Sequence, residues 1–158
     1  MEKPQIITPP NLLRERVTGS GPISEEMLAR ADAAVGSLSA EFAALLATEI
    51  AKLGGLQAQG AAATPARRLE IAKAIFEITH DLRGQAGTFD YSLITRIGSS
   101  LCRFIENLTA CDERSYEVIR VHIEAMDAVL HNALHGDGGP LGQAIAGGLE
   151  TAVKKILS

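Results

Sequence analysis

Aromatic residues are scarce in this chain, at 4% of 158 residues, and tryptophan does not occur. Hydrophobic residues still make up 46% of the sequence, so leucine, isoleucine, valine and alanine must supply most of any interior. A chain of this length is typical of one domain. We therefore expect a single domain with a sizeable, mainly aliphatic core.

Cysteine, basic charge and long apolar runs are also limited. The two cysteines, Cys102 and Cys111, lie too close in sequence to suggest a framework disulfide, and they fit a reducing compartment. Basic residues number 15 against 19 acidic ones, which argues against a nucleic-acid surface. We find no run of about 18 apolar residues and no secretory signal, so we expect a cytoplasmic protein without a membrane span.

No segment sustains the period-two alternation of a half-buried strand. Apolar residues instead recur with helical spacing, and the predicted helices cover about 24–53, 65–87, 90–108, 112–130 and 141–157. Long helices joined by short loops pack antiparallel to their neighbours. We therefore predict an all-α fold, an up-and-down antiparallel four-helix bundle with additional N- and C-terminal segments.

Residues 1–23 differ in composition from the rest, because they hold most of the prolines. Proline and glycine disfavour a helix, so we expect an extended tail or strap there. The helical bundle should then occupy residues 24–158. Gly36 and Ser37 are candidates for bending or splitting its first helix.

Local residue types indicate where several helices begin. Thr64 followed by Pro65 is a common start, since threonine caps the helix and proline suits its first turn. Asp90 is expected to cap the third helix, and Asp112 or Ser115 the fourth.

The second predicted helix carries the most informative residue, His80. At about 100° of rotation per residue, its apolar residues form one stripe, made of Ile71, Ile75, Ile78, Leu82 and Phe89. His80 points roughly 180° away from this stripe. We therefore predict an imidazole that stands in solvent in the middle of a helix.

Two residues near His80 suit a phosphoryl group delivered by another protein. Arg83 places a cation one turn further on, and Gly84 at the i+4 position has no side chain to shield the ring. A neutral imidazole can attack phosphorus, and the cation can pair with phosphate oxygens. The pattern favours an accessible nucleophile over a structural histidine.

The segment Ile78–Gly87 resembles the histidine-containing phosphotransfer (Hpt) domains of bacterial and plant phosphorelays. The family pattern is a histidine, two residues, a lysine, a glycine and then small residues, which His80, Arg83 and Gly84 match apart from arginine for lysine. The resemblance covers roughly residues 24–132. It includes aliphatic positions on the following helix, matched by Ile94, Ile97 and Leu101.

The resemblance implies a role for each matching residue. His80 would accept the phosphoryl group on Nε2 from a receiver-domain aspartate and pass it on. Arg83 would pair with phosphate oxygens, with the bidentate geometry of arginine in place of that of lysine. Cys102 falls where the family often has a polar side chain near the imidazole, with Arg103 and Glu106 nearby, but a thiol cannot orient the ring as glutamine or glutamate would.

The resemblance also implies partners. These are response-regulator receiver domains, with a hybrid histidine kinase as a further candidate. It implies no cofactor on this chain, because the receiver supplies both the aspartate and the Mg²⁺ that neutralises phosphoryl charge. The protein would be a monomeric phosphoryl carrier without catalytic machinery of its own, and we expect neither nucleic acid nor membrane as a partner.

Three further residues are candidates for partner docking. Phe76 lies one turn before His80 and is predicted to project toward solvent, either as an apolar anchor for a receiver or as the edge of the core. Gly84 and Gly87 would leave room for the partner's surface.

The other histidines give a weaker signal. His131 and His135 have the i, i+4 spacing of two ligands on one helix face. No glutamate follows His131, and no clear third ligand exists beyond His122 or Asp137, so we expect no metal site and interpret His122 as a packing residue. Gly138–Gly142 lacks the lysine and hydroxyl residue of a phosphate loop and is interpreted as a turn.

Two functions follow from this sequence. The first is the phosphorelay carrier described above. The alternative is a phosphate-independent helical adaptor that binds receiver domains or other proteins, which would keep its partners without phosphorylation at His80.

Overall fold

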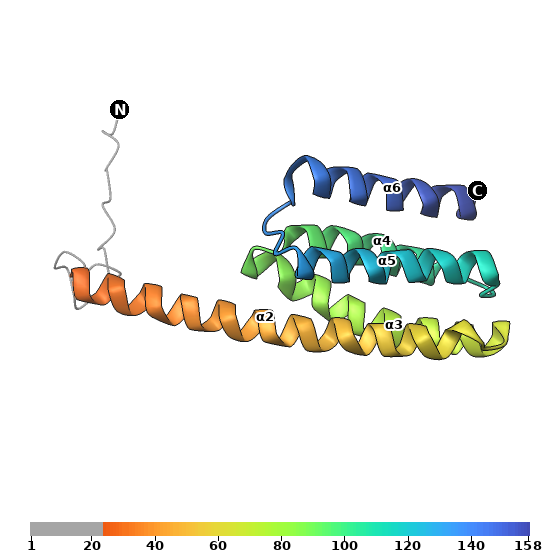
Figure 1. Cartoon of the computed structure of the whole chain (residues 1–158), viewed down its shortest axis with the longest axis horizontal. Helices are drawn as coiled ribbons and strands as arrows, with labels where there is room; N and C mark the ends of the chain where they lie inside the picture. The colour runs from red at the N-terminus through yellow and green to blue at the C-terminus, as the bar shows by residue number, and fades with distance from the viewer. Residues whose placement is uncertain (1–23) are drawn as a thin grey trace, which may run out of the picture. The chain divides into compact units, whose positions relative to one another are not determined.

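The computed structural model describes residues 24–158, and the tail or strap predicted for residues 1–23 lies outside them. The described part contains helices and no strand, which confirms the predicted all-α class there. The helices are α2 (Glu25–Ala61), α3 (Pro65–Ala86), α4 (Ser92–Glu106), α5 (Glu113–His131) and α6 (Gly139–Leu157), and a 3-10 turn, η1 (Gly87–Phe89), follows α3 (Figure 1).

Contacts divide the chain into two units, with the boundary between Ser37 and Leu38. The described residues of the first unit form the beginning of α2, and large apolar side chains there, such as Met27 and Val35, are exposed. The second unit contains the rest of α2 and all later elements. The helix itself is not interrupted at Gly36 or Ser37, where the sequence suggested a bend or a split.

Helix α2 is also long and apolar enough, by length and composition, to cross a membrane. A core helix of a soluble protein passes the same test. The side chains of Phe42, Leu46, Ile50 and Leu53 in α2 are buried within the second unit, as in a core helix. The absence of a membrane span therefore stays a prediction.

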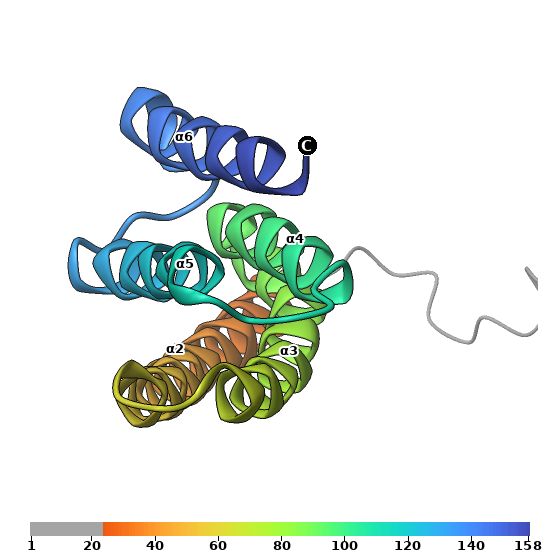
Figure 2. The same ribbon diagram turned by 90° about the vertical axis from the view of Figure 1, so that its right-hand side faces the viewer.

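Within the second unit, the helices lie side by side. Figure 2 looks along them and shows α2 beside α3, α4 beside α5, and α6 against α4 and α5. Side chains of α2 and α3 line one groove, and those of α2 and α5 line another, so α2 lies next to both helices. Helix α3 makes its most extensive helix contact with α4, which places α4 beside the segment that carries His80.

The core of this unit is aliphatic, as the composition predicts. Its largest fully buried side chains come from α2, α3, α4 and α5, with Leu46, Ile75, Ile97, Phe104 and Met126 among them. Three of the few aromatic residues lie together: the ring of Phe42 stacks on that of Phe89 at 4.3 Å between centroids, and it lies 6.0 Å from the ring of Tyr91. Burial of this apolar surface drives the helices together.

Two of the predicted helix starts are confirmed. The Thr64 hydroxyl accepts a hydrogen bond from the backbone N–H of Arg67, and Pro65 occupies the first turn of α3. The Asp112 carboxylate accepts one from the backbone N–H of Ser115 at 2.8 Å and caps α5. Both contacts satisfy N–H groups that lack a partner inside the helix.

The predicted cap at Asp90 is wrong. The residue at the N-cap of α4 is Tyr91, and Asp90 has a φ of 63°, in the left-handed region. A capping residue needs an extended backbone instead. A tertiary contact explains the difference: the Asp90 carbonyl accepts a 2.7 Å hydrogen bond from the N–H of Gly136, in the loop before α6.

Other boundaries also differ. Helix α2 continues through Gly54 and Gly55 to Ala61, beyond the predicted end near residue 53. Helix α3 ends at Ala86, one residue before the predicted Gly87, which begins η1. Helix α6 begins at Gly139 rather than Leu141, because Pro140 fits the first turn of a helix. The turn predicted for Gly138–Gly142 is therefore limited to its first residue, and Gly138 has a φ of 70°.

Candidate functional site

His80 lies on α3, one and a half turns before the end of the helix. Its side chain is 52% exposed. The apolar residues of α3 explain this position, since Ile71, Ile75 and Leu82 are buried on the opposite side. The expected solvent-facing imidazole is thus present, although Ile78 and Phe89 of the predicted stripe are only partly buried.

Phe76 accompanies His80 on the same helix. The two ring centroids are 5.7 Å apart. Phe76 does not project freely into solvent, because it is partly buried and packs against the core. It lines a shallow groove together with Leu69 and Lys73 of α3 and with residues at the end of α4. Of the two interpretations of Phe76, the structure supports an edge-of-core position and leaves docking as a prediction.

Arg83 is partly buried between α3 and α4. Among residues 24–158, its side chain makes no ion pair and no hydrogen bond, so its charge is not neutralised by this part of the protein. The backbone carbonyl of Arg83 accepts a 3.2 Å hydrogen bond from the Thr95 hydroxyl of α4. This contact ties the backbone of the cation to the neighbouring helix.

Cys102 of α4 is fully buried. Burial raises the pKa of its thiol to about 11, while the charge of Arg83 lowers it and that of Glu106 raises it. The thiol is therefore protonated at neutral pH, and it makes no hydrogen bond to His80 within the described chain. The structure does not give Cys102 the supporting contact near the imidazole that its position in the sequence suggested.

The two glycines proposed for docking are both exposed. A Cβ built on Gly84 would meet no atom within 4 Å, so the surface next to His80 is open there. A Cβ on Gly87, which lies in η1, would come into ordinary contact with the Thr95 hydroxyl at 3.5 Å. Gly84 therefore leaves more open space on the surface than Gly87 does.

A third glycine, Gly98 of α4, was not identified from the sequence. A Cβ at this position would lie 3.1 Å from the Cβ of Arg83 and 3.3 Å from Cγ2 of Thr79. Gly98 thus permits the close approach of α4 to α3 beside Thr79 and Arg83. Sequence spacing cannot show which residues of two helices meet, so no local signal marked it.

Asp81 was also missed, although it directly follows His80. Its Oδ1 lies 3.6 Å from Nδ1 of the imidazole, an ion-pair distance that exceeds the length of a hydrogen bond. The sequence did contain a sign of this contact, because the carboxylate of Asp81 directly follows a histidine that is predicted to face solvent.

The remaining histidines lie elsewhere. His122 is fully buried between α4 and α5, which confirms its packing role, and His131 and His135 are exposed. Nδ1 of His131 contacts Asp127 of the same helix at 3.2 Å, whereas His135 packs near the ring of Tyr91. Among residues 24–158, no group of three or more histidine, cysteine, aspartate or glutamate side chains could hold a metal ion.

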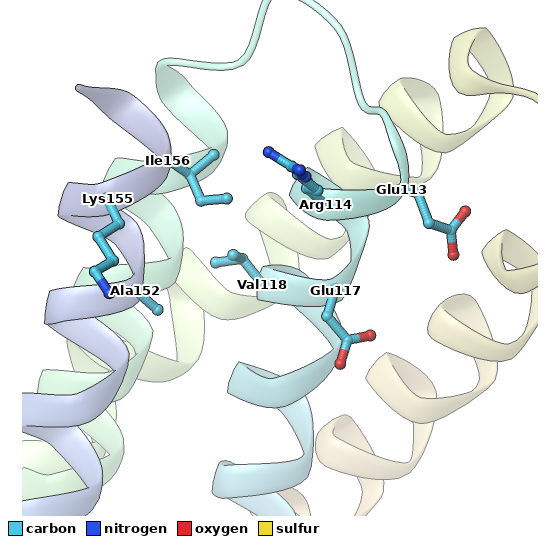
Figure 3. Close-up of a pocket in the computed structure, with 7 residues that line it drawn as sticks. All are labelled: Glu113, Arg114, Glu117, Val118, Ala152, Lys155 and Ile156. Carbon is cyan, nitrogen blue, oxygen red and sulfur yellow. The ribbon is translucent and has the colours of Figure 1, made fainter.

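A separate groove of about 480 Å³ lies between the start of α5 and the end of α6 (Figure 3). Val118, Ala152 and Ile156 form its apolar wall, and charged residues such as Arg114 and Lys155 surround it. None of the residues proposed around His80 lines this groove.

Comparisons with protein-family models, with curated proteins and with solved structures found no significant match.

Proposed function

We propose that this chain is a histidine phosphotransfer protein that carries a phosphoryl group between receiver-domain aspartates. The observation that carries the proposal is the surface around His80. An exposed imidazole stands beside an open approach at Gly84, with the unneutralised cation of Arg83 one turn away.

The proposed transfer needs little from this chain beyond these groups. Nε2 of His80 attacks the phosphorus of an aspartyl phosphate, the N–P bond forms, and the P–O bond to the aspartate breaks. The electron pair of the broken bond stays on the receiver's carboxylate. Arg83 binds the phosphoryl oxygens through charge-assisted hydrogen bonds, and Mg²⁺ bound by the receiver neutralises further charge.

The proposal extends to the architecture. We assign α2 to α5 to an up-and-down antiparallel four-helix bundle, with α6 and the N-terminal segment as additions. In this arrangement α4 supports the face of α3 that carries His80. The protein would act as a cytoplasmic monomer, with receiver domains, among them those of hybrid histidine kinases, as its partners.

One experiment tests the phosphoryl-carrier function. Receiver domains are phosphorylated with acetyl phosphate and mixed with the wild-type protein and with His80→Gln. The wild type should gain an acid-labile, base-stable phosphoryl group, and His80→Gln should gain none while keeping its circular dichroism spectrum, since His80 is exposed.

His131→Gln is the matched control, because His131 is an exposed helical histidine that also lies beside an aspartate. It should accept phosphate as the wild type does. Phosphorylation of His80→Gln, or of no protein in the series by any receiver tried, would contradict the proposal.

The second candidate is the phosphate-independent adaptor. The exposed apolar side chains of α2, such as Leu28 and Val35, favour it, since exposed apolar surface often marks a binding surface. The same protein series separates the two functions. Binding of a receiver to both the wild type and His80→Gln, without phosphoryl transfer to either, would support the adaptor.

A further inference from the structure

Asp81 supplies the carboxylate nearest to the candidate phospho-acceptor. Within residues 24–158, it is the carboxylate that reaches the ring of His80 within 4.0 Å, with 3.6 Å between Oδ1 and Nδ1. Its side chain is 82% exposed and makes no hydrogen bond in that part of the chain. Asp81 is therefore free to turn toward the ring.

The neighbouring helix offers no competing partner. Cys102 is buried with a protonated thiol. In the described chain, neither Arg103 nor Glu106 makes an ion pair or a hydrogen bond with His80. If the ring of His80 is oriented by a polar side chain, the structure points to its own helix rather than to α4.

We propose that Asp81 is a positioning residue for His80. Its carboxylate favours the imidazole tautomer with the proton on Nδ1, since a negative charge stabilises an N–H that points toward it. The lone pair of the neutral ring is then on Nε2, the nitrogen away from Asp81. This inference rests on the proposed function, in which Nε2 attacks phosphorus.

The same carboxylate stabilises the product of the attack. When the Nε2–P bond forms and the P–O bond of the donor breaks, the ring still carries its proton on Nδ1 and becomes positively charged. Asp81 lies beside that proton, so the attraction is stronger after the attack than before it. Only interactions that strengthen along the reaction raise its rate.

The expected effect is small, because the pair is exposed to water. An exposed ion pair stabilises a charged group only slightly. The corresponding lowering of the activation free energy changes the rate about two- to fivefold. The test therefore needs a direct reading of the tautomer as well as a rate.

Nitrogen-15 NMR of the unphosphorylated protein reads the tautomer of His80 directly. At a pH where the ring is neutral, Asp81→Asn should lower the fraction with the proton on Nδ1, and Asp81→Glu should restore part of it. Glu77→Gln is the matched control, because it removes one negative charge from an exposed position on the same helix, one turn before His80. It should leave the tautomer as in the wild type.

Phosphoramidate then gives the rate without any receiver domain. Nε2 attacks its phosphorus, the P–N bond breaks, ammonia leaves, and the ring later releases its proton to the buffer. Asp81→Asn should be phosphorylated about two- to fivefold more slowly than Glu77→Gln. Such a loss, together with the tautomer change, supports the role of Asp81.

The outcomes separate this inference from the proposed function. Equal tautomer fractions in Asp81→Asn and the wild type would overturn the role of Asp81, even if His80 accepts phosphate from receivers. If Asp81→Asn changes the tautomer but no receiver phosphorylates the wild type, the carrier function is overturned, while the contact between Asp81 and His80 is supported. If Asp81→Asn changes the tautomer but reacts with phosphoramidate as fast as Glu77→Gln, Asp81 does not contribute to the rate of phosphorylation, and its proposed role is overturned.

Discussion

At the scale of single residues, His80 and Gly84 form the simplest part of the site. The imidazole is exposed, and the surface four residues further along α3 is open because Gly84 has no side chain. Glycine inside a helix costs about 1 kcal/mol relative to alanine, so this position gives up helix stability. The proposed carrier function would give this cost a reason, since a partner's active site would then have to come close to the ring.

Replacement of Gly84 by residues of two sizes tests this explanation. Gly84→Ala should raise the free energy of unfolding by up to about 1 kcal/mol, because its Cβ meets no other atom. Phosphoryl transfer from a receiver should be nearly unchanged in this variant. Gly84→Gln should fold equally well but slow transfer strongly, since its side chain would occupy the approach to His80. Equal transfer rates for the two variants would show that the partner does not pass over this position.

At the scale of the helices, Arg68 joins the first turn of α3 to two other helices. Its guanidinium donates hydrogen bonds to the carbonyl oxygens of Gly60 and Ala61 at the end of α2, and it pairs with Glu113 at the start of α5. It also lies over the ring of Tyr116, 4.8 Å from the centroid. One buried guanidinium thus holds the end of α2, the start of α3 and the start of α5 together. The ammonium group of a lysine could not make these bonds with the same geometry.

Loss of this guanidinium should destabilise the protein. Arg68→Met keeps an apolar stem but leaves two carbonyls without their charged donor, which should cost about 2–4 kcal/mol in the free energy of unfolding. Urea denaturation measures this change. Arg67→Met is the matched control, because Arg67 is exposed and forms a surface ion pair with Glu70 of the same helix, so its loss should cost less than about 0.5 kcal/mol. Similar losses for both variants would show that Arg68 does not hold the helices together.

At the scale of the second unit, His122 is a polar group in the middle of an aliphatic core. The Val118 carbonyl can only accept, so Nδ1–H of His122 donates to it at 2.7 Å, and Nε2 of the neutral ring accepts from the Ser100 hydroxyl at 3.1 Å. These bonds satisfy both ring nitrogens and connect α5 to α4. Burial lowers the pKa of His122, and the hydrogen bond to Val118 opposes this effect in part.

The lowered pKa predicts a loss of stability in acid. Because the unfolded chain binds a proton on this histidine more readily than the folded chain does, its contribution is complete above a pH of about 6.5 and is lost as the pH falls further. The slope from one such group is at most about 1.4 kcal/mol per pH unit. The free energy of unfolding, measured from pH 8 to pH 5, should therefore fall more steeply for the wild type than for His122→Gln. His131→Gln, which removes an exposed histidine, should follow the wild type, and parallel curves for the wild type and His122→Gln would contradict the prediction.

The sequence by itself determined what depends on neighbouring residues along one helix. The periodicity of Ile71, Ile75 and Leu82 was enough to place His80 in solvent, and the caps at Thr64 and Asp112 follow from bonds that span only three residues. Such features are local, so propensity and spacing predict them.

Only the tertiary structure decided which helix faces meet. The burial of His122 depends on Ser100, 22 residues away, and the left-handed Asp90 depends on a hydrogen bond from Gly136. The partial burial of Phe76 and the close approach at Gly98 likewise come from the contact between α3 and α4. These features depend on contacts between distant segments, because the free energy of side-chain packing belongs to pairs of helices rather than to either sequence alone.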